Sequence, residues 1–107
     1  MIKEKKKRNL IKVLDETITI SKKKGNGILK FLANTDEKGN LISYSLTYIN
    51  PNIFNKDNGR ILGYDNEHGY HHRHYMGKEE SITFLTFEEI KERFETEWRE
   101  IHEKHKK

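Results

Sequence analysis

The segment LISYSLTYI, residues 41–49, alternates between two sets of side chains along its whole length. A period of two residues is typical of a β-strand that packs one face on a core. Ile42, Tyr44, Leu46 and Tyr48 make up the more apolar set, so we expect this set to face the interior. Tyr44 is interpreted as a core residue. Tyr48 is left open between the core and the stacking of a nucleic-acid base.

Short β-branched and apolar runs on both sides of this segment predict further strands, separated by turn residues. We expect a loop at residues 50–59, which contain the single proline, with Ile53 and Phe54 anchoring a segment that is otherwise a candidate flexible flap. Gly69 suits a bend between two of the later strands. The strands are predicted at residues 17–20, 28–33, 60–64, 72–75 and 81–84.

The C-terminal third of the chain predicts a long helix. Thr86 and Glu89 have the spacing of a capping box, with Thr86 as the N-cap. An apolar stripe then recurs every three or four residues, at Phe87, Ile90, Phe94, Trp98 and Ile101. This helix should begin near Phe87, extend to the late lysines and pack on the sheet.

The N-terminal part of the chain predicts a short helix that ends near Asp15, because Leu10, Val13 and Leu14 have helical spacing. An arm that leads into a strand is the alternative. The predicted fold class is therefore α+β. It is an antiparallel β-meander of about five to six strands with a short N-terminal helix and a long amphipathic C-terminal helix on one face, forming a single domain over residues 1–107.

Composition narrows the classes of function. The 107 residues carry a formal net charge of +4, with a basic run at residues 3–8, which favours a polyanionic partner. Solvated lysines explain the charge equally well. The chain has no cysteine, which excludes disulfides and thiolate zinc sites. No apolar run of about 20 residues and no signal-peptide core occur, so we expect a cytoplasmic protein with no membrane contact.

Histidine is concentrated in one short segment, because four of the six histidines lie within residues 68–74. If residues 72–74 are extended, the His72 and His74 side chains share a face, with Cα atoms about 6.6–6.8 Å apart. Two such imidazoles could flank a phosphodiester as base and acid. Arg73 could neutralise the developing charge if a bulge turned it inward, and Asp65 could orient one imidazole. With RNA the nucleophile would be the 2′-hydroxyl, so no metal would be needed.

Three other interpretations of the segment stay open. His72 and His74, with Asp65 or His68, could hold Zn, Ni or Cu. Alternatively the segment could bind phosphates without cleaving them, or the histidines could be solvated and idle.

The residues Gly59-Arg60-Ile61-Leu62-Gly63-Tyr64-Asp65-Asn66, followed by Gly69 and His72-Arg73-His74, resemble the signature of the TumE-type toxins of bacterial and archaeal toxin–antitoxin systems. The resemblance covers roughly residues 41–101. It implies a toxin suspected of acting on RNA, with an antitoxin that covers the basic site or the C-terminal helix. In that family an arginine commonly precedes Tyr-Asp-Asn, whereas Gly63 stands here. Arg60 or Lys30 would then have to substitute for it.

The leading hypothesis is a metal-independent ribonuclease toxin without a cofactor. Its partners would be RNA and a cognate antitoxin, and homo-oligomerisation is left open. The candidate catalytic residues are His72, His74, Arg73 and Asp65, and the candidate substrate-binding residues are Tyr64, Asn66, His71, Lys30 and Arg60. The alternative is a non-catalytic nucleic-acid-binding or protein-interaction module from a mobile or defence locus. A third candidate is a metal-dependent hydrolase that uses His68, His72 and His74.

Overall fold

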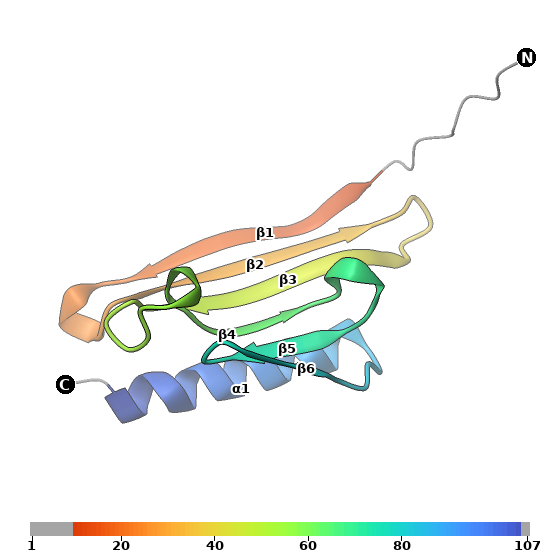
Figure 1. Cartoon of the computed structure of the whole chain (residues 1–107). Coiled ribbons are helices and arrows are strands. Elements are labelled where there is room, and N and C mark those ends of the chain that lie inside the picture. The colour runs from red at the N-terminus through yellow and green to blue at the C-terminus, as the bar shows by residue number, and fades with distance from the viewer. Residues whose placement is uncertain (1–9, 106–107) are drawn as a thin grey trace, which may run out of the picture.

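The computed structural model describes residues 10–105 and contains one antiparallel sheet and one long helix (Figure 1). The six strands lie in the sheet in chain order, and each pairs with the next one. This arrangement confirms the α+β class, the antiparallel meander and the C-terminal helix. The elements are β1 (Ile11–Ile20), β2 (Gly27–Thr35), β3 (Leu41–Ile49), β4 (Arg60–Asp65), β5 (His72–Tyr75), β6 (Lys78–Ser81) and α1 (Phe87–His105).

The predicted N-terminal helix is wrong as far as residues 10–15 are concerned, because these residues lead into and form β1. This strand pairs with β2 from Ile11 opposite Thr35 to Ile20 opposite Gly27. A register shift lies between Lys12 and Leu14. Such a bulge adds one residue to a strand, which breaks the period of two and mimics helical spacing. The basic run at residues 3–8 lies outside the described residues.

One face of the sheet, which we call the helix face, packs against α1. The predicted apolar side of β3 lies here, with Tyr44, Leu46 and Tyr48 buried. Phe94 of α1 is fully buried, and its ring meets that of Phe31 edge-on, with centroids 5.6 Å apart. The start of the helix is also as predicted, since the Thr86 hydroxyl accepts the backbone N–H of Glu89 at 3.1 Å. An N-cap of this kind stabilises a helix by about 1 kcal/mol.

The opposite face of the sheet, which we call the polar face, carries the side chains that alternate with the core residues. Residues directly opposite each other on antiparallel strands point to the same face. The register therefore aligns two rows across the polar face. One contains Thr17, Lys30, Thr47, Gly63 and His74, and the other contains Asp15, Leu32, Ser45, Asp65 and His72.

The segment between β3 and β4 is held at its base. Asn50 is buried, and its side-chain amide donates to the carbonyls of Gly25 at 3.2 Å and Asn26 at 3.1 Å. Ile53 and Phe54 pack against the core, which confirms their predicted anchoring role.

The last strand is displaced from its predicted position. It comprises Lys78–Ser81, and residues 82–86 belong to no strand or helix. Met76 and Gly77 both have positive φ, at 50° and 82°, which is typical of the tight turns that join hairpin strands. The charged sequence of β6 lacks an apolar alternation, so the sequence pattern missed it. Within residues 10–105, no helix combines the length and the apolar character that crossing a bilayer requires.

Candidate active site on the polar face

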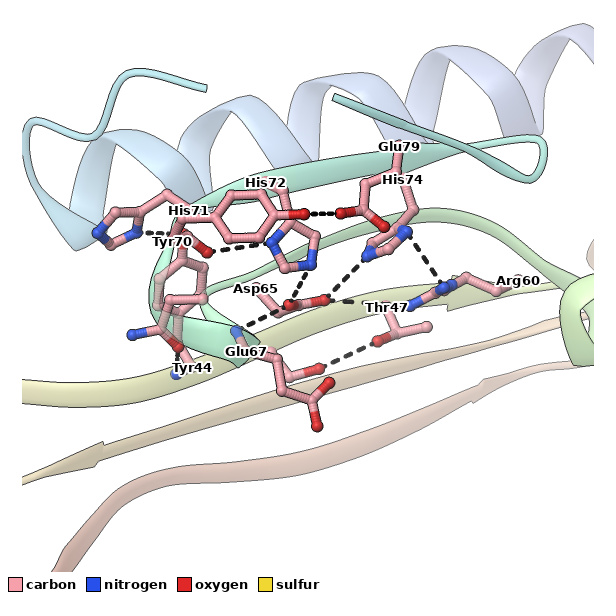
Figure 2. A network of polar contacts seen from close by, with 12 residues as sticks. Tyr44, Thr47, Arg60, Asp65, Glu67, Tyr70, His71, His72, His74 and Glu79 are labelled. Carbon is pink, nitrogen blue, oxygen red and sulfur yellow. Dashed lines mark hydrogen bonds and ion pairs between the residues drawn. The ribbon is translucent and has the colours of Figure 1, made fainter. Parts of the chain in front are cut away.

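Four side chains from β4 and β5 meet on the polar face, and we call them the His–Asp–Arg cluster: Arg60, Asp65, His72 and His74 (Figure 2). The register explains their convergence, since Asp65 lies opposite His72 and Gly63 lies opposite His74. The two imidazole centroids are 4.7 Å apart. This geometry confirms that the His72 and His74 side chains share a face, and both contact the Asp65 carboxylate.

His72 is only 2% exposed, and both of its ring nitrogens are engaged. Nδ1 lies 3.0 Å from the Tyr70 carbonyl oxygen, and Nε2 lies 2.7 Å from Oδ1 of Asp65. A carbonyl oxygen can only accept, so Nδ1 must carry a hydrogen. The contact between Nε2 and the carboxyl oxygen then requires one further proton. His72 and Asp65 together therefore hold a proton that can be given away.

His74 differs from His72, because one of its ring nitrogens faces a donor and not an acceptor. An Nη2–H of Arg60 lies 3.2 Å from Nδ1, and Nε2 lies 3.3 Å from Oδ2 of Asp65. Guanidinium groups only donate, so Nδ1 must offer a lone pair and Nε2 must carry the hydrogen. Burial, and then the positive charge of Arg60, lower the pKa of His74 below its ordinary value. His74 is therefore a neutral imidazole near pH 7, with its lone pair beside a cation.

The Arg60 side chain reaches the cluster by passing over Gly63. A Cβ atom on Gly63 would lie 3.1 Å from Cδ of Arg60, so the arginine stem occupies the space that a side chain at position 63 would take. Asp57 holds the guanidinium through Nε at 2.8 Å, and Oδ2 of Asp65 lies 4.0 Å from Nη1. Arg60 thus places a cation over position 63, as its predicted role as a substitute requires. Lys30 is exposed two strands away, about 10 Å by strand spacing.

A groove of about 330 Å³ extends from the cluster across β3 to β2. Arg60 and Asp65 line one part, and Leu32 and Ser45 contribute an apolar surface and a hydroxyl group. Asn34 also lines it and donates to the Ser43 hydroxyl at 3.0 Å. The groove therefore offers a cation beside a mixed apolar and hydrogen-bonding surface, a combination that suits a nucleotide.

The structure does not bring Arg73 and Tyr64 into the cluster. They lie opposite each other on the helix face, where both contact Glu97 of α1. Arg73 binds the Glu97 carboxylate through two nitrogens, at 3.2 and 2.7 Å, and a third nitrogen lies 3.0 Å from Glu80. Burial raises the pKa of Tyr64 to about 12, and its hydroxyl donates to Glu97. These contacts tie the sheet to the helix.

His71 and Asn66 are also absent from the cluster. The His71 ring stacks on Phe84, with centroids 4.1 Å apart, and burial lowers its pKa. The Asn66 side chain accepts the backbone N–H of Tyr44 and donates to the Ile42 carbonyl, each at 3.0 Å. Asn66 therefore bonds the backbone of β3 just beyond the end of β4, which is a structural role.

Tyr70 and Glu79 belong to the site although no sequence pattern predicted them. The Tyr70 ring lies over that of His72, with centroids 4.6 Å apart, and its hydroxyl donates to Glu79 (Figure 2). Tyr70 is 41% exposed, so it forms the outer surface over a buried histidine. The sequence contains no signal for this, because the contact depends on the turn at η3 (Glu67–Gly69) and on the pairing of β5 with β6.

The donor atoms of Asp65, His72 and His74 lie within 4.8 Å of one another, which is the composition of a two-histidine, one-carboxylate metal site. Within residues 10–105 that group does not include His68. The hydrogen bonding fits a metal poorly, however. Both Nε2 atoms face the carboxylate, whereas the Arg60 contact leaves the His74 lone pair on Nδ1. The guanidinium would also repel a cation bound at Asp65.

The fold and the cluster together define a small α+β protein with a compact set of acid–base groups on an open sheet face. A family model described as Toxin TumE matches residues 6–105, so the chain belongs to the TumE toxin family. This confirms the resemblance noted in the sequence and identifies the chain as the toxin component of a toxin–antitoxin system, with a cognate antitoxin as its partner. Searches among curated proteins and among solved structures found no match.

Proposed function

We propose that this toxin is a metal-independent ribonuclease whose reaction takes place at the His–Asp–Arg cluster. The observation that carries the proposal is that two imidazoles contact the same carboxylate but differ in protonation. His74 offers a lone pair, and His72 shares a proton with Asp65. A general base and a general acid on the same face are what transesterification of a phosphodiester requires.

The phosphate first draws the Arg60 guanidinium away from His74 Nδ1, which frees the lone pair of this nitrogen. The ribose 2′-oxygen then attacks the adjacent phosphorus atom, and His74 Nδ1 takes the 2′-hydroxyl proton. The bond from phosphorus to the 5′-oxygen breaks, and that oxygen receives the proton held by His72 and Asp65. The products are a 2′,3′-cyclic phosphate and a 5′-hydroxyl end. Arg60 replaces Arg73 in our assignment, because its guanidinium lies beside His74 and can bind the phosphoryl oxygens.

Access to the acid requires Tyr70 to move. His72 is covered by the Tyr70 ring, whereas the His74 side chain is 13% exposed. The hydrogen bond from Tyr70 to Glu79 is at the surface, so it costs little to break. A base of the RNA can then stack on the displaced ring, and the groove over Leu32 can hold the neighbouring nucleotide.

The test is cleavage of a single-stranded RNA in EDTA by the wild type, His72→Ala and His74→Ala. We expect each variant to lose about 10²–10⁴-fold in rate, the usual contribution of a general acid or base. His68→Ala is the matched control, since His68 lies outside the cluster on the exposed turn η3, and it should cleave like the wild type. A single 2′-deoxy substitution at the cleaved position should stop cleavage there.

Each alternative predicts a different result. Equal cleavage by the wild type and both alanine variants would remove the two histidines from the mechanism. Salt-sensitive RNA binding without any product would favour the non-catalytic binding module. Activity that EDTA abolishes and a divalent ion restores would favour the metal-dependent hydrolase.

A further inference from the structure

The two edges of the sheet differ in how well they are protected against pairing with another strand. The edge strand β6 has four residues, Lys-Glu-Glu-Ser, and all four are exposed. The other edge strand, β1, has ten residues, IKVLDETITI, and no proline. Proteins commonly protect edge strands by keeping them short and charged, as β6 is. The long edge strand β1 has its three charged residues and one bulge within residues 11–16, and its last four residues carry no charge.

The exposed apolar side chains gather at β1. Leu10, Ile11, Val13 and Ile18 are between 45% and 57% exposed, and they account for four of the seven large hydrophobic residues exposed within residues 10–105. In Figure 1 β1 forms the upper edge of the sheet, and α1 lies at the bottom. The helix packs mainly on β3 and β4, so it leaves the apolar side chains of β1 uncovered. A surface of this kind is typical of an interface.

The charges of β1 point to one particular occupant. Lys12 lies near the start of the strand, and Asp15 and Glu16 follow near its middle. Lys12 contacts Asp15 at 3.2 Å, but both side chains are more than half exposed, so this pair is weak and can exchange partners. A second copy of the strand in antiparallel orientation reverses the order of the charges. Lys12 of each copy then meets Asp15 of the other copy, because both side chains lie on the polar face.

We propose that β1 is a self-association edge, which pairs antiparallel with β1 of a second copy and joins two six-stranded sheets into one. The pairing is isologous, so every favourable contact occurs twice about the two-fold axis. It satisfies the free backbone groups of the edge and covers the apolar side chains around Val13 and Ile18. The His–Asp–Arg cluster lies on β4 and β5, so both copies keep it open.

The test is a pair of complementary charge variants, each measured alone and in an equimolar mixture by analytical ultracentrifugation over a concentration series. The Lys12→Glu variant places an acidic residue against Asp15 of the other copy, and the Asp15→Lys variant places two basic residues against each other. Each variant alone should dimerise at least about tenfold more weakly than the wild type, since like charges opposite each other destabilise strand pairs. The mixture should form a heterodimer, because each altered charge then faces its opposite.

Lys78→Glu on β6 is the matched control, and its dimerisation should equal that of the wild type. Restoration by mixing excludes misfolding as the cause of the losses, and circular dichroism of each variant checks the fold. A wild type that stays monomeric at 100-fold above the toxin concentrations used for cleavage assays would overturn the proposal. So would two variants that fail to pair when mixed. A monomer whose β1 pairs only with the cognate antitoxin would also overturn it and assign the edge to that partner.

Discussion

Neighbouring residues of β4 and β5 form two ionic clusters on opposite faces of the sheet. The clusters differ in how closely their carboxylates match the donor groups around them. On the helix face, Arg73 and Tyr64 meet Glu97, and Glu80 adds a second carboxylate to the arginine. On the polar face, Asp65 faces two imidazoles and a guanidinium, and Asp57 adds a second carboxylate to the guanidinium. The first cluster is complete within the protein. The second keeps hydrogen-bonding capacity for a ligand, because Arg60 lies 4.0 Å from Asp65 and His74 is a neutral imidazole.

The two sets of contacts indicate which cluster is available for chemistry. A charge that its own protein already neutralises stabilises the fold and has little left for a ligand. The guanidinium and imidazole groups beside the groove can donate hydrogen bonds to an anion, and the low exposure of His72 and His74 strengthens such bonds. The comparison predicts that variants of the polar face lower activity, whereas variants of the helix face lower stability.

After the two histidine variants, Arg60→Met should lower activity most, because it keeps a stem over Gly63 and removes the charge. We expect cleavage to fall about 100-fold, the usual cost of losing one charge-stabilising donor. The acidic limb of the pH profile should also move. Arg60 helps to lower the pKa of His74, so the variant should protonate this base at a higher pH than the wild type. The loss of kcat/KM should therefore be greater at pH 6 than at pH 8.

A matched control for this prediction is Lys30→Met, which removes a positive charge from the same face about two strands away. It should weaken RNA binding slightly and leave the shape of the pH profile unchanged. An Arg60→Met profile that superimposes on that of the wild type would remove the guanidinium from the environment of the base.

Most of the fold follows from sequence periodicity. The period of two in β3 and the stripe through Ile90 and Phe94 predicted the core face and the helix that covers it, because burial imposes these periods. The prediction for the start of β1 was wrong because the bulge at Val13 disrupts the alternation of side chains. β6 was placed too late because a short charged edge strand packs nothing and leaves no apolar pattern.

The candidate site could be predicted only in part. The clustering of histidines located His72 and His74, and the pleat of the strand indicated that Arg73 points the other way. Arg60 was offered as a substitute for a missing family arginine, and it occupies the space above Gly63. The roles of Tyr70 and Glu97 depend on how distant elements pack. Neither a motif nor a spacing in the sequence contains that information.

An intermediate effect is expected on the helix face. Glu97→Ala leaves the Tyr64 hydroxyl and part of the Arg73 guanidinium without their acceptor, which typically costs about 1–3 kcal/mol of the free energy of unfolding. Urea denaturation should show this loss, while the cleavage rate per folded molecule stays within about twofold of the wild type. Glu95→Ala, on the same helix, is the control. Within residues 10–105, Glu95 pairs with Lys91 and Arg99 at the helix surface, and such pairs are worth about 0.3–0.5 kcal/mol each.

The smallest effect should come from Gly63→Ala, which tests whether the glycine serves the arginine. The added methyl group would lie 3.1 Å from Cδ of Arg60, and this flexible stem can shift by a few tenths of an ångström. We expect a loss of activity of about three- to fivefold, since small misplacements of a catalytic group lower rates. The same substitution in the Arg60→Met background should cost less, because no guanidinium remains to be misplaced. Equal losses in the two backgrounds would mean that the added methyl group disturbs the sheet and not the position of Arg60. Gly63 would then have no role in placing the guanidinium.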